Sequence, residues 1–263
     1  MKQHPFFHGL VAPLHISHRG GAALYPENTL YAFERAMKVH RTDMLELDVH
    51  ASSDGEVVVA HDATLDRCTN GSGPLSALPF RELSRLDAAF HFTPVGEVGT
   101  PLRGKGITLP SLREVLAASG KLRLNVEIKS EGAIEPFVAL VKQEQCLERL
   151  CIGSEHDSIA AELARLLPEA CLFFPANALA AFVLPTKAGE PPQDDPRYTV
   201  LDMPYRYEGV VLFDAALAEV AKRHHKWINV WTVDEEVEMH RCVTAGVGGV
   251  MTDRPDVLRA VLS

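Results

Sequence analysis

The sequence predicts a single (β/α)8 barrel, an α/β fold, because short strand-like runs alternate with helical patterns along the chain. Strands that alternate with helices favour a parallel sheet, and eight such units in roughly 250 residues fit a closed barrel. The chain has 263 residues, of which 46% are hydrophobic, so it can bury one large core. We therefore expect one domain over residues 1–263.

Eight short runs of apolar or alternating residues are candidate strands, one for each unit of the barrel. In chain order they are residues 15–18, 44–49, 122–128, 150–153, 171–174, 200–203, 228–233 and 249–252. Helical spacing of apolar residues follows most of them, at residues 30–37 after a cap at Asn28 or Thr29, and at 112–117, 134–141, 159–167, 215–221 and 237–243.

Two stretches depart from this regular alternation. Residues from about 69 to 110 are too long for an ordinary connection between a strand and a helix, and they contain clusters of Gly and Pro. We interpret them as a small insertion after the second strand, lying over the barrel mouth. Residues 177–198, which include a second Pro-rich segment, are interpreted as a mobile loop.

The second candidate strand carries two carboxylates on one face. Side chains alternate along a strand, so Glu46 and Asp48 point the same way while the leucines beside them point the other way. Buried together they would repel, and one would keep its proton unless a cation lay between them. Hard oxygen ligands favour Mg²⁺ or Ca²⁺ over zinc. The alternative is an edge strand with solvated carboxylates, since charged side chains are normally exposed.

The third candidate strand carries polar groups at alternate positions as well. Asn125, Glu127 and Lys129 share one face of residues 122–128 and the position that follows. If this face meets the carboxylates of the second strand, Glu127 completes a three-carboxylate site and Lys129 can contact a phosphate oxygen. Otherwise the two residues form a surface ion pair. Arg19 offers a second cation, whose planar fork suits two phosphate oxygens at once.

Two histidines complete the set of reactive side chains. His18 ends the first candidate strand and His61 follows the second one. In-line displacement at phosphorus needs one group to accept a proton and another to donate one, and histidine suits both tasks near neutral pH. Barrel enzymes act at the C-terminal ends of their strands, where His18, Asp48, Glu127 and Trp231 all lie. By residue type alone, Trp231 would be assigned to the core.

Composition excludes several other classes of function. A net charge of −9 without a basic cluster argues against a nucleic-acid partner. The chain has no apolar run of about eighteen residues, so we expect no transmembrane segment. Its beginning lacks the apolar core of a secretory signal, which makes a cytoplasmic location the expectation. The five cysteines show no spacing typical of zinc or redox sites.

Several short motifs, taken in their order and spacing, resemble those of the glycerophosphodiester phosphodiesterases over residues 14 to 262. The motifs are His18-Arg19-Gly20-Gly21, Pro26-Glu27-Asn28-Thr29, Glu46-Leu47-Asp48-Val49, Asp54-Gly55 with residues 61–67, Asn125-Val126-Glu127-Ile128-Lys129, Val230-Trp231-Thr232-Val233 and Thr252-Asp253-Arg254-Pro255. In one place the chain departs from the family pattern, because Gly248 lies in a stretch where the family usually has an aspartate.

The resemblance implies a barrel hydrolase that binds one divalent metal ion, Mg²⁺ or Ca²⁺. Such an enzyme cuts small glycerophosphodiesters, for example glycerophosphocholine and glycerophosphoethanolamine, to glycerol 3-phosphate and an alcohol. The resemblance gives a role to each residue singled out above: catalysis to His18 and His61, metal binding to Glu46, Asp48 and Glu127, and substrate binding to Arg19, Lys129 and Trp231.

Two other functions remain open at this level. One is a lysophospholipase D-type hydrolase, for which an apolar groove in the insertion near Phe80, Phe90 and Phe92 would be the distinguishing feature. The other is a non-catalytic barrel that binds phosphoglycerol compounds, but binding alone does not require the positioned acid and base that His18 and His61 offer. The sequence predicts neither which histidine is the acid, nor whether water or the glycerol 2-hydroxyl attacks, nor the head group, nor the oligomeric state.

Overall fold

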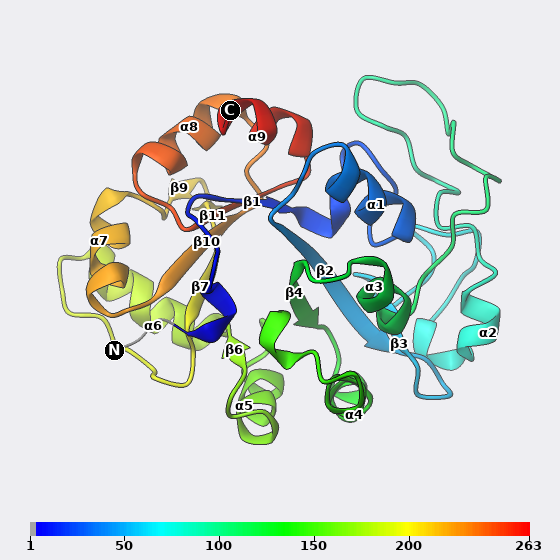
Figure 1. Cartoon of the computed structure of the whole chain (residues 1–263), viewed down its shortest axis with the longest axis horizontal. Helices are drawn as coiled ribbons and strands as arrows, with labels where there is room; N and C mark the ends of the chain where they lie inside the picture. The colour runs from blue at the N-terminus through cyan, green and yellow to red at the C-terminus, as the bar shows by residue number, and fades with distance from the viewer. Residues whose placement is uncertain (1–3) are drawn as a thin grey trace.

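Eight parallel strands form a nearly closed barrel in the computed structural model, which describes residues 4–263 (Figure 1). In sheet order they are β6 (Cys171–Leu172), β5 (Leu150–Gly153), β4 (Arg123–Ile128), β2 (Met44–Ala51), β1 (Leu14–Ser17), β11 (Gly249–Thr252), β10 (Trp227–Trp231) and β7 (Val200–Pro204). A single parallel bridge between Phe173 and Val200 joins the two ends of this order. The predicted barrel is therefore confirmed.

Helices surround the strands, as Figure 1 shows. They are α1 (Leu30–Lys38), α3 (Leu112–Ala118), α4 (Ile134–Glu144), α5 (Asp157–Leu166), α6 (Ala176–Lys187), α7 (Ala215–Arg223), α8 (Glu236–Thr244) and α9 (Pro255–Val261). Several of these helices begin at a residue whose side-chain oxygen accepts a hydrogen bond from a backbone N–H group. The first turn of a helix leaves such N–H groups unpaired, so these caps stabilise the start of the helix. Thr29 caps α1, Asp214 caps α7, and Ser111 with Glu114 forms a reciprocal capping box on α3.

The prediction of a mobile loop over residues 177–198 was wrong for its first half, which forms helix α6. Alanine and leucine dominate the segment before Pro185, and both are strong helix formers. The Pro-rich composition that suggested a loop belongs only to the residues that follow the helix. A short hairpin of β8 (Arg206–Tyr207) and β9 (Val210–Val211) after β7 was also not predicted.

The segment between β2 and α3 leaves the regular barrel pattern and projects to one side of the molecule in Figure 1. Its first element, β3 (Val57–Val59), pairs antiparallel with β2, and short helices η3 (Leu75–Ala77) and α2 (Phe80–Leu83) follow. The segment has a small apolar core of its own: Val58, Ala60, Leu65, Leu75, Leu83, Ala88 and Leu109. Burial of these side chains holds the long connection in place despite its lack of long helices.

The N-terminal end of the barrel is closed by the short helix η1 (Pro5–Phe7). Phe6 and Phe7 are buried among residues at the beginnings of the strands, and the ring of Phe7 stacks on Trp227 with centroids 4.5 Å apart. Arg123 ties this helix down by donating to the carbonyl of Phe6 at 2.8 Å. Over residues 4–263, no helix has both the length and the apolar character needed to span a membrane.

Candidate active site

A cavity of about 770 Å³ opens at the C-terminal ends of the barrel strands. Its lining includes all the residues that the sequence singled out: His18, Arg19, Glu46, Asp48, His61, Glu127, Lys129 and Trp231. Strand register explains how they meet, because Ser17 at the end of β1 pairs with Leu45, so the rest of β2 extends beyond β1. Asp48 then pairs with Glu127 on β4.

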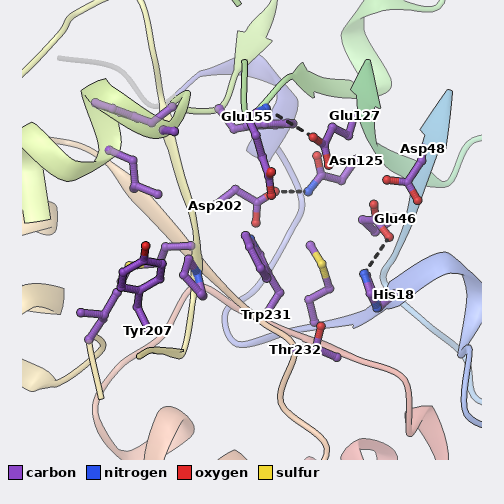
Figure 2. A pocket seen from close by; sticks show the side chains of 18 of the residues that line it. His18, Glu46, Asp48, Asn125, Glu127, Glu155, Asp202, Tyr207, Trp231 and Thr232 are labelled. Atoms are coloured by element: carbon purple, nitrogen blue, oxygen red, sulfur yellow. Dashed lines mark hydrogen bonds and ion pairs between the residues drawn. The ribbon is translucent and has the colours of Figure 1, made fainter. Parts of the chain in front are cut away.

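His18 is held by an aspartate from the other end of the chain. Its Nδ1 lies 2.7 Å from Oδ1 of Asp253, and its Nε2 lies 3.8 Å from Oε2 of Glu46 (Figure 2). Asp234 fixes Asp253 in turn by accepting from its backbone N–H and from the hydroxyl of Thr252. Burial alone would lower the pKa of His18, but Glu46 and Asp253 outweigh it and raise the pKa, so the imidazolium form is favoured.

His61 is held in a similar way by its neighbour in the chain. Its Nδ1 lies 2.7 Å from Oδ1 of Asp62, whose other oxygen accepts from Nε of Arg67 at 2.6 Å. Arg67 lowers the pKa of Asp62 to about 2, so the carboxylate stays charged beside the ring. His50 helps to hold the loop that carries His61, because Nε2 of His50 lies 3.0 Å from the carbonyl oxygen of His61. Both reactive histidines therefore have Nδ1 paired with an aspartate.

Arg19 turns into the cavity through an unusual stretch of backbone. Arg19 has φ 49° and Gly20 has φ 85°. Both values lie in the left-handed backbone region, where residues with a Cβ are strained and glycine is not. A Cβ on Gly20 would also lie 2.8 Å from the Cβ of Ala32, so only glycine lets α1 pack this closely. In this conformation the backbone N–H of Arg19 donates to Glu46 at 2.9 Å, and its Nε lies 3.3 Å from Asp48.

The Pro-Glu-Asn-Thr motif supports the two charged groups from behind. Glu27 accepts from Nη1 of Arg19 at 3.1 Å and binds both terminal nitrogens of Arg67. The side chain of Asn28 donates to Asp48 at 2.9 Å. Glu27 thus orients Arg19, and through Arg67 it links the loops that carry the two histidines.

Three carboxylates face the cavity in a mostly buried setting. Asp48 is only 1% exposed, which rules out the alternative of a solvated edge strand. Burial and the charge of Asp48 raise the pKa of Glu46 well above its usual range. Burial raises the pKa of Glu127 to about 7, although Lys129 lies 3.1 Å away and opposes the change. Lys129 also lies 3.6 Å from Asp48, so its contacts are within the site and not on the surface.

The donor set suits a hard divalent cation. Carboxylate oxygens are the ligands that Mg²⁺ and Ca²⁺ prefer, and a cation between Glu46 and Asp48 would offset the repulsion that raises the pKa of Glu46. Within residues 4–263, the structure has no group of three or more His, Cys, Asp or Glu side chains placed close enough together to hold a metal ion. Glu46, Asp48 and Glu127 thus match such an ion in the type of their ligand atoms, although their side chains do not converge on one point in this structure.

A sequence model of the glycerophosphoryl diester phosphodiesterase family matches residues 18–257, a span that contains every charged side chain and every histidine of the cavity lining. The chain belongs to this family. Glycerophosphodiester phosphodiesterases are phosphoric diester hydrolases, and this chain is accordingly an enzyme of that class.

Individual members of the family match over almost the whole chain. A glycerophosphodiester phosphodiesterase of Caldanaerobacter subterraneus is 31% identical, with 92% of this chain and 95% of the relative covered. Lysophospholipase D GDPD1 of Mus musculus is 32% identical, with 95% and 86% covered. Among solved structures, the phosphodiesterase domain of a Mycobacterium tuberculosis protein has a TM-score of 0.86 at 20% identity, covering 95% of this chain and 98% of that one, and shows the same fold.

Two acidic residues of the candidate site were not predicted to belong to it. Asp202 on β7 is buried beside Asn125 of β4, whose amide donates to it, and burial raises the pKa of Asp202 to about 7 (Figure 2). Within the described residues, Oδ1 of Asp202 has no hydrogen-bond partner. Asp253 lies in a motif that the sequence did reveal, but its pairing with His18 joins positions 235 residues apart.

The departure from the family pattern at Gly248 has a local cause far from the cavity. Gly248 precedes β11 at the closed end of the barrel, and a Cβ there would lie 2.5 Å from Nε1 of Trp227 and 2.7 Å from the carbonyl oxygen of Ile228. Any larger side chain would displace the indole that packs on Phe7. Glycine at this position belongs to the packing of the barrel floor.

The cavity lining contains none of Phe80, Phe90 and Phe92, near which an apolar groove would have distinguished a lysophospholipase D-type hydrolase. Phe80 packs against the small core of the insertion, and the ring of Phe90 contacts the ring of His91 and the guanidinium of Arg103. The apolar part of the cavity is lined instead by α6 and by residues around the β8–β9 hairpin. Helix α6, whose residues the sequence analysis interpreted as part of a loop, supplies much of this apolar lining.

Proposed function

We propose that the protein hydrolyses glycerophosphodiesters such as glycerophosphocholine and glycerophosphoethanolamine to glycerol 3-phosphate and an alcohol. The supporting observation is the pair of histidines, His18 and His61, each bound to an aspartate through Nδ1 and both facing a cavity that also contains Arg19 and Lys129. Family membership supports the reaction class, and the matching Caldanaerobacter relative is named for this activity.

Arg19 and Lys129 bind the phosphate in this proposal. The phosphodiester carries one negative charge, and the transition state carries more, so fixed cations stabilise it more strongly than the substrate. Glu27 keeps the guanidinium of Arg19 in place at 3.1 Å, so little reorganisation is needed when the charge develops. The positive charge of Lys129 is partly neutralised by Glu127 and Asp48. This neutralisation ends when other cations bind these two carboxylates.

His18 acts as the acid and His61 as the base. The carboxylates of Glu46 and Asp253 favour a proton on His18, which Nε2 donates to the oxygen of the leaving alcohol. The charged Asp62 accepts the Nδ1 proton of His61, which leaves Nε2 free to accept a proton from the attacking hydroxyl. Water and the glycerol 2-hydroxyl both suit this base as nucleophiles.

Glu46, Asp48 and Glu127 bind one divalent ion, Mg²⁺ or Ca²⁺, in this proposal. When bound, such an ion supplies positive charge that stabilises the phosphate oxygens as the reaction proceeds. The raised pKa values of Glu46 and Glu127 support the assignment, because a cation would offset both the cost of burying these charges and the repulsion between them and Asp48. We further predict a cytoplasmic location for the protein. We also predict that residues 1–263 form a single domain with an insertion at about 69–110.

Lysophospholipids are a second candidate class of substrate. One observation favours them: the cavity continues past Trp231 into a region lined mainly by apolar side chains. The mouse relative is named lysophospholipase D.

The test is release of glycerol 3-phosphate by the purified protein from glycerophosphocholine and from glycerophosphoethanolamine. We expect chelation with EDTA to abolish turnover and added Mg²⁺ or Ca²⁺ to restore it on both substrates. Full turnover after exhaustive chelation would contradict the metal site, and no turnover under any condition would contradict the proposed substrates.

A further inference from the structure

Two carboxyl groups of the cavity lining have no positively charged partner in the part of the chain that the structure describes. Asp202 lies on β7 and Glu155 follows the end of β5, and both line the cavity. Within residues 4–263 neither forms an ion pair, whereas Glu46, Asp48 and Glu127 each pair with a histidine, an arginine or a lysine. A carboxylate removed from water is costly unless another group supplies positive charge. A cationic ligand would meet this requirement at Asp202 and Glu155.

Asp202 in particular is placed to contact a ligand. It is only 8% exposed, yet it belongs to the cavity lining. One of its oxygens accepts from the amide of Asn125, while Oδ1 has no hydrogen-bond partner among the described residues. The side-chain oxygen of Asn125 is unpaired in the same part of the structure. Buried acceptors without partners are uncommon in folded proteins, so this pair indicates a ligand that the cavity receives.

Glu155 faces the same part of the cavity. Burial is the main cause of the raised pKa of Asp202 and of Glu127, and the negative charge of Glu155 adds to both effects. Figure 2 shows the side chain of Glu155 extending toward Asp202. Lys129 pairs with Glu127, and the divalent ion of the proposed function neutralises that carboxylate further. The negative charge of Asp202 and Glu155 remains for another ligand.

An aromatic ring lies on the same inner face of the barrel as Asp202. Strand β10 pairs with β7 so that Asn229 is opposite Asp202, and Trp231 lies two residues further along β10, where alternation returns side chains to that face. Phe173 and Tyr207 extend the aromatic part of the cavity lining. The face of an indole attracts cations, and quaternary ammonium groups are recognised by aromatic rings in this way. Carboxylates beside an aromatic ring therefore suit an organic ammonium ion.

We propose that Asp202, Glu155 and Trp231 bind the ammonium group of the substrate's head group, and we call residues 155, 202 and 231 the cation subsite. The inference rests on the proposed function and deepens it, because it names the class of head group that the enzyme selects. Choline and ethanolamine carry such a group, whereas glycerol and inositol are neutral and serine adds a carboxylate. The cation subsite should therefore favour glycerophosphocholine and glycerophosphoethanolamine over diesters with neutral or acidic head groups.

The position of the cation subsite fits the direction in which the head group leaves. His18 donates a proton to the oxygen of the leaving alcohol in the proposed mechanism. In Figure 2, His18 and Asp202 lie on either side of Trp231, and the charge of His18 acts on Asp202. In choline, two methylene groups separate the ammonium nitrogen from the leaving oxygen. The head group can thus extend from His18 along the indole toward the two carboxylates.

The test compares glycerophosphocholine with the 3,3-dimethylbutyl ester of glycerol 3-phosphate, in which a carbon atom replaces the charged nitrogen. The two esters have the same shape, so a difference in kcat/KM reports the charge of the head group. We expect kcat/KM to be about 10-fold to 30-fold higher for glycerophosphocholine, because the ammonium group is bound by an aromatic ring and carboxylates inside a cavity. Equal values for the two esters would overturn the proposal.

Two substitutions that keep the shape of the side chain locate the effect in the cation subsite. Asp202→Asn and Glu155→Gln each remove a charge, so each should lower the ratio of kcat/KM between the two esters at least about threefold. Glu236→Gln is the matched control, because Glu236 has a side chain that is 70% exposed on α8 and lies outside the cavity lining. Its ratio should equal that of the natural protein.

Two results with these variants would overturn the assignment. One is an unchanged ratio in Asp202→Asn and Glu155→Gln, even with both rates lowered, which would assign these carboxyl groups to another part of the substrate. The other is the same fall of the ratio in all three variants, Glu236→Gln included. Such a fall would show that the overall charge of the protein, and not a local subsite, selects the head group.

Binding to the His61→Ala protein separates the cation subsite from the proposed function. Titration calorimetry with the two esters and Mg²⁺ needs no turnover, and Kd should be lower for glycerophosphocholine by about the same factor. Such a difference in Kd, without hydrolysis of either ester by the natural protein, would support the cation subsite and refute the proposed function. Hydrolysis of glycerophosphocholine together with equal Kd values for the two esters would support the proposed function and overturn the cation subsite.

Discussion

Replacing Asp202 with asparagine should make the protein more stable above neutral pH. Burial raises the pKa of Asp202 from 3.8 to about 7 in the folded chain, while the unfolded chain keeps an ordinary value. Between these two values the folded state binds more protons than the unfolded state, so stability falls as pH rises. Asparagine has nearly the same shape and does not ionise, and its side-chain oxygen can still accept from Asn125.

The size of the effect follows from the two pKa values. At about 1.4 kcal/mol per pKa unit, the rise from 3.8 to about 7 corresponds to a penalty of roughly 4 kcal/mol well above pH 7. Roughly 2 to 3 kcal/mol of this penalty develops between about pH 5 and pH 8. For a chain of this size that corresponds to a relative change in Tm of roughly 5 to 10 °C.

The assay is thermal unfolding of the natural protein and Asp202→Asn in EDTA, followed by circular dichroism across this pH range. The Tm of the natural protein should drop more steeply with rising pH, so the advantage of the variant grows toward pH 8. Other buried carboxyls, such as Glu127, titrate in both proteins and largely cancel in the comparison. Parallel Tm profiles would refute the reasoning.

Two further substitutions test how the histidines are held. Asp253→Asn removes one of the two carboxylate charges, the other being Glu46, that favour a proton on His18. The kcat should therefore fall about 10-fold to 100-fold, and the alkaline limb of the pH profile of kcat should move to lower pH. An unmoved limb would contradict the role of Asp253. Arg67→Ala removes the hydrogen bonds that hold both Asp62 and Glu27, and it should lower kcat about tenfold. The kcat of Arg67→Lys should lie between those of Arg67→Ala and the natural protein, because an ammonium group lacks the planar fork of a guanidinium. Equal kcat in the three proteins would show that this link is not needed.

The barrel and much of the site follow from local sequence patterns. Alternation along residues 44–49 correctly predicts that Glu46 and Asp48 share a face, because a strand fixes side-chain direction from one residue to the next. The order of strands and helices then brings these carboxylates to the same end of the barrel as His18 and Glu127. These predictions need no knowledge of distant contacts.

The parts that were missed depend on how distant segments meet. Asp202 reaches Asn125 from a strand that is not adjacent in the sheet, so no local spacing reveals the contact. Asp253 supports His18 only once β1 and β11 pair and close the barrel. Helix α6 was overlooked for a different reason, because the Pro-rich residues after Pro185 obscured a helix-forming segment before them.

The most direct test of two-histidine catalysis is the rate of glycerol 3-phosphate release from glycerophosphocholine by His61→Ala beside the natural protein, both supplied with Mg²⁺ or Ca²⁺. With the base removed, kcat should fall at least about 100-fold. The Kd of the substrate should stay nearly unchanged, because Arg19 and Lys129 still bind the phosphate. A kcat within about threefold of the natural protein would contradict the assignment of His61 and, with it, the proposed chemistry of the site.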